Sequence, residues 1–271
     1  MNTKSLSILT LAVLGTLYGP SQAWAASILG TADNFGILAG ETVTNSGTSI
    51  VSGNIGVSPG SAVTGFPPGI VIGGTIHTAD AVANQAQIDA TAAYNSLASQ
   101  MVTQNLTGQD LGGKTLTPGV YRFDSSAGLT GNLKLNAQGN SNALFVFQIG
   151  STLTTASSSS VSLINGGPDS GVYWQVGSSA TLGSSSEFRG NILALTSISL
   201  DPYAHIGCGR ALAQTGSVTM ANTNRVYSTH CGSGLNGGAL ATTVPLPAAL
   251  PLLGAGLAGL TGLGFRRRRL G

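Results

Sequence analysis

Short segments with the character of β-strands return at similar intervals along this chain of 271 residues. Thr181-Leu182, Ser199-Leu200 and Thr219-Met220 follow one another at nearly equal spacing, and Phe147-Gln148 returns after a somewhat longer interval as Trp174-Gln175. A repeat unit of about 20 residues cannot bury a hydrophobic face alone, so such units stack on their neighbours and build a solenoid. The repeats therefore predict a mainly β fold, an irregular right-handed β-helix with three sides and about three strands in each coil.

Glycines mark the corners that such coils require. A Gly-Asn-Ile or Gly-Asn-Leu step occurs at Gly53, Gly131 and Gly190, and glycine best tolerates the left-handed backbone of a tight corner. Charged residues make up only 7% of the chain, against about 25% in an ordinary soluble domain. This composition excludes a helical array, a coiled coil and a disordered polyelectrolyte. A β-sandwich is disfavoured because the hairpin signals Asn165-Gly166 and Asn236-Gly237 do not divide the chain regularly.

One segment interrupts the β pattern and has the periodicity of a helix. No glycine or proline occurs from Thr78 to Gln100, and apolar residues recur there at steps of three or four. Thr78 is the expected N-cap, with Asp80 in the first turn. We predict an α-helix over about residues 78–100 that lies flat against one side of the solenoid, because a lone helix with so narrow an apolar face is unstable. The predicted apolar face consists of Val82, Ala86, Ala90, Ala93, Leu97 and Met101.

The N-terminus has the features of a secretory signal peptide. Lys4 supplies a positive charge, Leu6 to Leu17 form an apolar run, and Ala23-Trp24-Ala25 places small residues where cleavage is expected. A short membrane anchor is the alternative, but the run is too short to cross a bilayer comfortably. The predicted organisation is a signal peptide at 1–25, a solenoid domain at 26–243 and a C-terminal segment at 244–271.

The C-terminal segment combines three features in a fixed order. Val244-Pro245-Leu246-Pro247-Ala248 is followed by uncharged, mostly apolar residues up to Phe265 and then by Arg266 to Arg269. The span from Leu246 to Phe265 is long enough for a transmembrane helix, and the arginines favour the cytoplasmic side. The segment resembles bacterial sorting signals of the VPLPA/PEP type. The resemblance implies an exosortase-like sorting peptidase as partner, membrane anchoring that is transient or permanent, and an address at the cell surface or in extracellular polymer. A plain tail anchor is the alternative.

The charge and the cysteine content limit the possible binding partners of the region between the two terminal segments. Without Lys4 and the four C-terminal arginines, six basic and nine acidic residues remain, so nucleic acid is not a predicted partner. Cys208 and Cys231 are the only cysteines, and in an exported protein they predict one disulfide. His205 and His230 lie within three residues of a cysteine, which leaves a metal site as the alternative.

Several glycine-rich stretches, taken in order, resemble one known family. From about Ala32 to Val226 the chain is similar to the widespread microbial ice-binding protein family, which is built on a discontinuous β-solenoid with an adjacent helix. The resemblance implies the same fold and adsorption to ice, which would inhibit ice growth and recrystallisation. The matching stretches are Asn34–Gly40, Gly53–Gly60, Val63–Gly69, Leu106–Gly113, Leu116–Tyr121, Phe145–Gly150 and Gly190–Ala194.

The strands that precede corner glycines supply a candidate ice-binding face. Side chains alternate across a strand, so Val51, Val63 and Leu129 are expected in the core and their neighbours outside. The outer face would carry small hydroxyl and methyl groups on strands stacked about 4.8 Å apart, a spacing near repeats of the ice lattice. The candidate ice-binding residues are Ile50, Ser52, Ala62, Thr64, Gly128, Thr130, Ser160 and Ser162.

Two sequence features do not fit a uniform face. Glu187 and Arg189 are expected on the same outward line, where their charges would interrupt it. The Thr-Xaa-Thr steps that begin at Thr42, Thr115 and Thr152 do not fall in one register along the sequence.

Two other classes of function compete with ice binding. A polysaccharide lyase or hydrolase needs paired carboxylates or a base beside a Ca²⁺ site. The nine acidic residues of the body form no close pair, and the sequence lacks serine-nucleophile, zinc and phosphate-loop motifs, so neither an enzyme nor a cofactor is predicted. A surface adhesion or matrix protein that binds exopolysaccharide is the alternative, because a fold does not fix its ligand.

Overall fold

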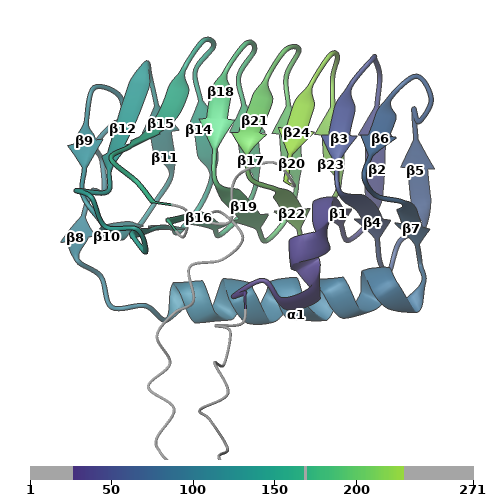
Figure 1. Cartoon of the computed structure of the whole chain (residues 1–271), viewed down its shortest axis with the longest axis horizontal. Coiled ribbons are helices and arrows are strands. Elements are labelled where there is room, and N and C mark those ends of the chain that lie inside the picture. The colour runs from purple at the N-terminus through teal and green to yellow at the C-terminus, as the bar shows by residue number, and fades with distance from the viewer. Residues whose placement is uncertain (1–26, 168–169, 229–271) are drawn as a thin grey trace, which may run out of the picture.

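Three parallel β-sheets and one long helix make up the part of the chain that the structure describes. The computed structural model describes residues 27–167 and 170–228. The strands stack in coils around a common core, and α1 (Ala81–Ala98) runs along one side of the stack (Figure 1). The predicted mainly β solenoid with three sides and a helix alongside is confirmed.

Most coils contribute one strand to each of the three sheets. Sheet A contains, in spatial order, β7 (Ile76–Thr78), β4 (Asn54–Val57), β1 (Phe35–Ala39), β22 (Ala211–Ala213), β19 (Asn191–Ala194), β16 (Gly171–Val176), β13 (Leu144–Ile149), β10 (Gly119–Phe123) and β8 (Gln104–Asn105). Sheet B contains β11 (Ala127–Leu129), β14 (Leu153–Thr155), β17 (Ala180–Leu182), β20 (Ile198–Leu200), β23 (Val218–Met220), β2 (Thr42–Asn45) and β5 (Ala62–Thr64). Sheet C contains β6 (Ile70–Ile72), β3 (Ile50–Ser52), β24 (Arg225–Tyr227), β21 (His205–Cys208), β18 (Glu187–Arg189), β15 (Ser160–Ile164), β12 (Asn132–Asn136) and β9 (Thr115–Leu116).

The coils follow a different order in space than along the chain. In the first coil β1 pairs with β22, β2 with β23 and β3 with β24, all of the last coil. The second coil, β4 to β6, therefore lies near one end of the stack, and α1 carries the chain to the other end, where β8 begins the return (Figure 1). The solenoid is discontinuous, and its first and last coils meet inside the stack.

The strand pairing confirms the sequence repeats and shows that the coils have two sizes. Thr181, Ser199 and Thr219 follow one another in register. Tyr121 pairs with Phe147 and Phe147 with Trp174 across long coils, whereas Trp174 pairs with Ile192 across a shorter one. The extra residues of the long coils lie mainly at the corner between sheets C and A, where β12 is joined to β13 and β15 to β16.

Glycine makes the same corner in the short coils. Gly190 alone separates β18 from β19, with a φ of 114°, and a Cβ there would lie 2.7 Å from Nε1 of Trp174. Gly209 occupies the corner of the next coil with a φ of 149°, and its Cβ would lie 1.9 Å from the carbonyl oxygen of Gly190. Both the backbone conformation and the space between coils therefore require a residue without a side chain.

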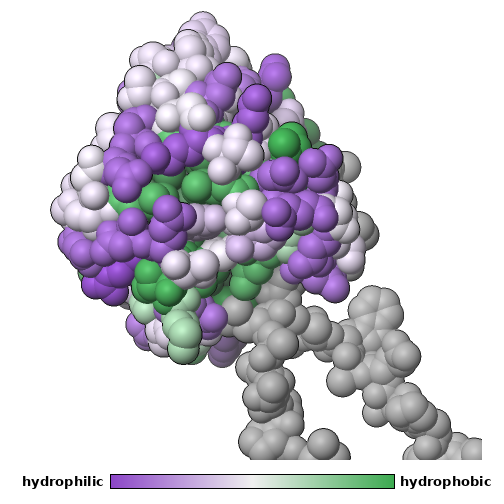
Figure 2. All heavy atoms as spheres, turned by 90° about the vertical axis from the view of Figure 1, so that its left-hand side faces the viewer, coloured by the Kyte–Doolittle hydropathy of each residue, from purple (hydrophilic) through white to green (hydrophobic). Residues whose placement is uncertain are grey.

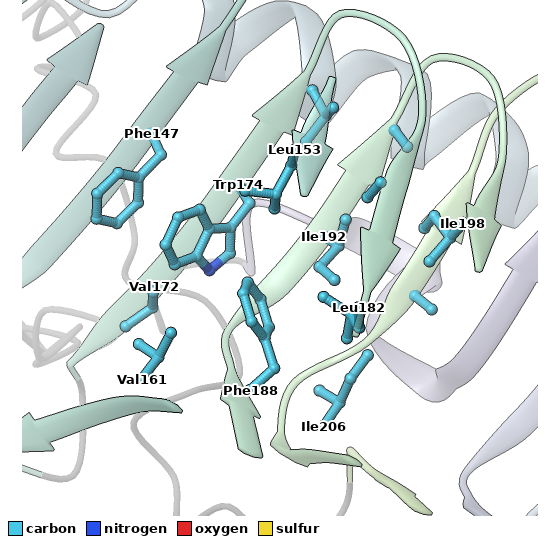
Figure 3. Close-up of a cluster of buried hydrophobic side chains, with 14 of the residues drawn as sticks. Phe147, Leu153, Val161, Val172, Trp174, Leu182, Phe188, Ile192, Ile198 and Ile206 are labelled. Carbon is cyan, nitrogen blue, oxygen red and sulfur yellow. The ribbon is translucent and has the colours of Figure 1, made fainter. Parts of the chain in front are cut away.

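Aromatic rings fill the core of the long coils and of the first short coil. Tyr121, Phe147, Trp174 and Phe188 follow one another with centroid separations of 5.5, 3.9 and 4.9 Å, the last three of them visible in Figure 3. Trp174 is fully buried and stacks on Phe147 at an angle of 8°. The short coils enclose less space, and aliphatic side chains such as Ile206 fill it (Figure 3). The core thus changes from aromatic to aliphatic one coil beyond the point where the coils shorten.

The helix begins later than the sequence predicts. Its first residue is Ala81 and its N-cap is Asp80, whose carboxylate accepts a hydrogen bond from the N–H of Ala83 at 2.8 Å. The prediction of Thr78 as N-cap is wrong because Thr78 ends β7, and Ala79, with a φ of 50°, separates the strand from the helix. A carboxylate caps a helix at least as well as a hydroxyl does.

The buried face of α1 agrees with the prediction only in its middle. Val82 is 48% exposed in the first turn, and Met101 lies beyond the helix and is 89% exposed, so the prediction is wrong at both ends. The helical residues that are buried are Ala83, Ala86, Ala90, Ala93 and Leu97. These mostly small side chains bring the helix close to sheet A, where it packs against residues such as Leu38, Tyr173 and Leu193.

A side chain from sheet A completes the C-terminal end of the helix. Gln148 of β13 donates hydrogen bonds from its side-chain nitrogen to the carbonyl oxygens of Leu97 and Gln100, at 2.8 and 2.9 Å. The last carbonyl groups of a helix have no partner within it, so a buried end needs such a donor. Gln148 is only 5% exposed and fixes the helix to the solenoid at this end.

Polar side chains dominate the surface at the end of the stack formed by β8 and β9. Viewed from that end, hydrophobic residues appear as patches between hydrophilic and intermediate ones (Figure 2). Leu106 and Leu111 of this end are buried. Such a cover is needed because the terminal coil of a solenoid otherwise exposes its core to water.

Several predictions concern residues outside the described ranges. The signal peptide at 1–25, the sorting segment at 244–271 and Cys231 all lie there. Within residues 27–167 and 170–228, no helix combines the length and the hydropathy needed to span a membrane. Cys208 ends β21 and is 5% exposed.

A buried ion pair joins the two parts of the chain where the first and last coils meet. Arg210 precedes β22, and Asp33 precedes β1. Nη2 of Arg210 lies 2.8 Å from Oδ1 of Asp33, while Nη1 donates to Oδ1 of Asn191 at 2.9 Å. Burial raises the pKa of Asp33, and the charge of Arg210, which lowers it, is the smaller effect. Arg210 is 2% exposed, so the pair fixes the register of this joint from within the protein.

Replacing Arg210→Met should lower the free energy of unfolding by about 3–5 kcal/mol at pH 7, because Asp33 would remain as a largely buried charge without a counter-charge. The loss should shrink as the pH falls toward the raised pKa of Asp33, since a protonated carboxyl group needs no counter-charge. Urea unfolding followed by circular dichroism at both pH values measures this. Arg225→Met, at an exposed arginine of β24, is the matched control and should cost less than about 0.5 kcal/mol. Equal losses for the two variants would contradict a special role for the joint.

Candidate functional site

Sheet B is the one face of the described solenoid that is both exposed and regular. α1 covers sheet A, and all six residues of β16 are buried there. Sheet C has a register shift between Phe188 and Arg189, and its β15 and β18 pair only through Ser160 and Glu187. The ladders of sheet B run through all seven strands without a shift.

Outward-facing small residues form a continuous row along the middle of sheet B, one from each strand. In spatial order the row consists of Gly128, Thr154, Thr181, Ser199, Thr219, Thr44 and Thr64, and we name it the central row. None of its hydroxyl groups hydrogen-bonds to another described residue. The hydroxyls of the central row are therefore available to solvent.

A second row of small residues lies two positions earlier along each strand. It consists of Ser126, Thr152, Ser179, Ser197, Ser217, Thr42 and Ala62, and we name it the flanking row. Oγ1 of Thr152 donates to Oγ of Ser126 at 2.9 Å, and Oγ1 of Thr42 donates to Oγ of Ser217 at 2.8 Å. Bonds of this kind, made across neighbouring strands, hold the hydroxyls of the flanking row in fixed directions.

The alternation of side chains within each short strand produces this face. In β23 the side chains of Val218 and Met220 are buried while Thr219 is exposed, and in β14 Leu153 is buried while Thr154 is exposed. Because the side-chain period of a strand is two, a slip of one residue would bury the hydroxyls and expose the apolar set. The apolar core therefore fixes which residues face water.

The two rows form a nearly uncharged grid. Neighbouring strands lie about 4.8 Å apart, and alternate residues along a strand lie about 6.7 Å apart. Charged residues stand at the margins: Glu41 contacts Ser217, Asp201 follows β20, and Asp110 pairs with Gly128 at one end. Such a grid offers no strong site for an ion, but it presents hydroxyl and methyl groups to water at regular positions.

Four of the eight predicted site residues belong to this region. Thr64 and Gly128 lie in the central row and Ala62 in the flanking row. Thr130 follows β11, and its hydroxyl donates to Oδ2 of Asp110 at 3.2 Å, so it is less available to water than the hydroxyls of the central row. Their role in binding remains a prediction.

The other four predicted residues lie on a different face. Ile50 and Ser52 belong to β3, and Ser160 and Ser162 belong to β15, both in sheet C. Ser52 is 1% exposed. The expectation that all eight residues share one outward face is therefore wrong. The charges of β18 also lie in sheet C, so they do not interrupt sheet B.

Two different corners that both use glycine explain this error. Gly53 and Gly190 turn the chain from sheet C to sheet A, with φ angles of 92° and 114°. Gly65 and Gly131 turn it from sheet B to sheet C, with φ angles of 79° and 84°. Both corners need a positive φ, so the glycine alone does not reveal which sheet precedes it.

Sequence reasoning left most of the central row out of the candidate site. The sequence repeat already aligned Thr181, Ser199 and Thr219, and the structure pairs them in that register. Thr44 and Thr154 belong to Thr-Xaa-Thr steps that are out of register in the sequence but occupy the same row in space. The spacing differs because the coils differ in length and because the chain path is discontinuous.

No group of three or more potential metal ligands of the His, Cys, Asp and Glu types occurs among residues 27–167 and 170–228. His205 is on β21 with Cys208, and its Nδ1 accepts a hydrogen bond from the N–H of Arg225 at 3.1 Å. His230, like Cys231, lies outside the described part of the chain.

The fold places the protein in the class of discontinuous three-sided β-solenoids that have a helix along one side. One of its sheets is regular and nearly uncharged. The chain belongs to the ice-binding family, since the family model described as ice-binding-like matches residues 37–226.

Individual relatives and a solved structure agree with this membership. An ice-binding protein of Nostoc sp. (strain HG1) is 54% identical over 269 residues, which cover 99% of this chain and 97% of that protein. An ice-binding protein of Flavobacterium frigoris (strain PS1) is 32% identical and covers 72% of this chain and 74% of its own length. The crystal structure of an ice-binding protein from the Antarctic ascomycete Antarctomyces psychrotrophicus matches this fold with a TM-score of 0.70 and 38% sequence identity. The match covers 75% of this chain and 98% of that protein chain.

Proposed function

We propose that the protein adsorbs to ice through sheet B and thereby inhibits ice growth and recrystallisation. The observation that carries this proposal is the unbroken register of the central row over seven strands, with hydroxyl groups that have no partner among the described residues. Family membership and the names of the relatives support the same activity. The proposal assigns the binding surface to both rows of sheet B.

Threonine suits such a surface for physical reasons. Its branched Cβ restricts χ1, so a hydroxyl and a methyl group are held in place with little loss of side-chain entropy on binding. The hydroxyl bonds to a water molecule, and the methyl group orders the water around it. A long flexible side chain such as lysine would lose up to about 2 kcal/mol of rotamer freedom on adsorption. Thr44, Thr154, Thr181, Thr219 and Thr64 therefore make better contacts than their modest polarity suggests.

Rigidity turns many weak contacts into firm adsorption. The strands of sheet B are fixed by parallel hydrogen-bonded ladders and by a close-packed core, so water bound at one position is in register with water at the next. An ice surface can then meet the whole ordered layer at once. Adsorbed molecules force the ice front to curve between them, and a curved front stops growing at temperatures where a flat one advances.

Replacing Thr181→Tyr in the middle of the central row should abolish thermal hysteresis, because the ring would stand above the plane and hold ice away from its neighbours. Nanolitre osmometry and recrystallisation in a frozen sucrose film measure the loss. The far-UV circular dichroism spectrum should stay unchanged, since the central row is on the surface.

Ser162→Tyr on β15 is the matched control, because Ser162 is one of the sequence-predicted residues that lie in sheet C. This variant should keep full activity. Loss of activity in Ser162→Tyr together with full activity in Thr181→Tyr would move the binding face to sheet C and contradict the proposal.

We also infer that the protein is exported and ends at the cell surface or in extracellular polymer. The signal-peptide features of residues 1–25 and the VPLPA/PEP-type segment at 244–271 support this, as does the similarity to ice-binding proteins. An exosortase-like peptidase is the proposed processing partner, and Leu246 to Phe265 would anchor the chain for a short or a long time. An exopolysaccharide is a second candidate ligand, and the cavity of sheet C that is lined by residues such as Glu187 and Arg189 favours it.

The two cysteines allow a test of the predicted disulfide. Protein recovered from outside the cytoplasm should take up alkylating reagent at neither Cys208 nor Cys231 before reduction and at both after reduction, as mass spectrometry would measure. The Cys208→Ser, Cys231→Ser double variant should lose about 3 kcal/mol of stability, because the disulfide closes a loop in the unfolded chain. Labelling of both thiols without reduction would contradict the disulfide.

A further inference from the structure

The change from long to short coils leaves a cavity in sheet C. β15 belongs to a long coil and β18 to a short one, and they pair only at Ser160 and Glu187 before they separate. On the other side of β18 the ladder to β21 shifts and leaves Gly207 unpaired. Between these strands lies a cavity of about 230 Å³, lined by Val161, Glu187, Phe188, Arg189, Gly207 and Cys208.

Arg189 lines this cavity and has one buried guanidinium nitrogen without a hydrogen-bond partner among the described residues. Its Nε is buried without a hydrogen-bond partner, and no carboxylate of the described residues lies within salt-bridge distance. By contrast, the buried Arg210 has Asp33 as partner at 2.8 Å, and the exposed Arg122 has Asp124 at 2.6 Å. Burial lowers the pKa of Arg189, which reflects the loss of water around its charge. A buried donor without an acceptor costs free energy that a bound acceptor would recover.

The backbone of Arg189 is held rigidly. Nε1 of Trp174 donates to the carbonyl oxygen of Arg189 at 3.0 Å, and the ring of Trp174 packs on the ring of Phe188 with centroids 4.9 Å apart. Figure 3 shows Trp174, Phe188 and Val161 close together at this step in the core. The strand that carries the arginine therefore does not need to be ordered when a ligand binds.

We propose that this cavity binds one sugar-acid residue, with the carboxylate of the sugar paired to Arg189. A guanidinium group recognises a carboxylate through two parallel hydrogen bonds and is the preferred partner of such groups. The volume lies below the range of about 300–1,000 Å³ typical of sites for drug-sized ligands, so it suits a single ring. Val161 and Phe188 lie at the floor of the cavity and, at 6% and 2% exposure, contribute only a small apolar surface to the contact with that ring.

Glu187 restricts the ligand further. Its exposed carboxylate lines the same cavity and accepts hydrogen bonds from hydroxyl groups, whereas it repels a second negative charge. The ligand should therefore carry one carboxylate and several hydroxyls, which describes a uronic-acid unit of an acidic polysaccharide. An extended peptide that adds a strand fits less well, because this mode of binding needs an exposed sheet edge, and the cavity lies between strands inside sheet C. The site is separate from sheet B, so this proposal does not rest on ice adsorption.

Titration of the full chain with D-galacturonate, followed by NMR at low ionic strength, tests the proposal. Galacturonate should bind with a dissociation constant in the millimolar range, and both galactose, which lacks the charge, and acetate, which lacks the ring, should bind at least about tenfold more weakly. Arg189→Gln should weaken galacturonate binding by about tenfold or more, since a charge-assisted pair is lost. Arg189→Lys keeps the charge but not the two parallel bonds and should give an intermediate loss.

Arg225→Gln, at an exposed arginine of the same sheet, is the matched control and should leave binding unchanged. Equal losses in the Arg189→Gln and Arg225→Gln variants would reduce the effect to general charge attraction and overturn the site. Acetate binding as tight as that of galacturonate would overturn the assignment to a sugar, and so would no binding by the unaltered chain. Recrystallisation activity should be the same in Arg189→Gln and the parent, which separates this test from that of sheet B.

Discussion

Parallel pairing in constant register is the constraint on which the proposed activity depends. In β17, β20 and β23 of sheet B a buried apolar residue lies on either side of a small polar one, so packing and pairing enforce the same register. Seven strands joined in this way present one residue each to a common row. A flexible loop could carry the same threonines, but ordering them would cost conformational entropy that weak contacts with water do not recover.

The three sheets have different structural roles in the solenoid. The helix α1 covers sheet A, and its small residues pack on the sheet. Gln148 holds the C-terminal end of the helix through a hydrogen bond. The differences in coil length are absorbed mainly at the corner between sheets C and A, and they disturb sheet C between β15 and β18. Sheet B is the face farthest along the coil from that corner, and it stays regular. The same irregularity that spares sheet B creates the cavity beside Arg189.

Sequence reasoning succeeded where the signal is local or periodic. The repeats that align Ser199 with Thr219 and Phe147 with Trp174 correspond to real strand pairs, and the alanine stripe correctly located the helix. The assignment of strands to faces failed because the corner glycines satisfy the same backbone requirement at different corners. No local pattern reports that β1 stacks on β22, since that contact joins distant parts of the chain. The helix start was missed because aspartate and threonine are both good caps by residue type.

The discontinuity couples the stability of the core to the quality of the surface. The joint between the two parts of the chain passes through sheet B between β23 and β2, where Thr219 pairs with Thr44. On the outside, Thr42 and Ser217 are hydrogen-bonded across it, and on the inside Arg210 and Asp33 are paired. A shift at the joint would divide the central row into one group of five strands and another of two, each in register only with itself. The buried ion pair therefore stabilises the register of the surface as well as that of the core, and the proposed adsorption to ice needs a continuous row.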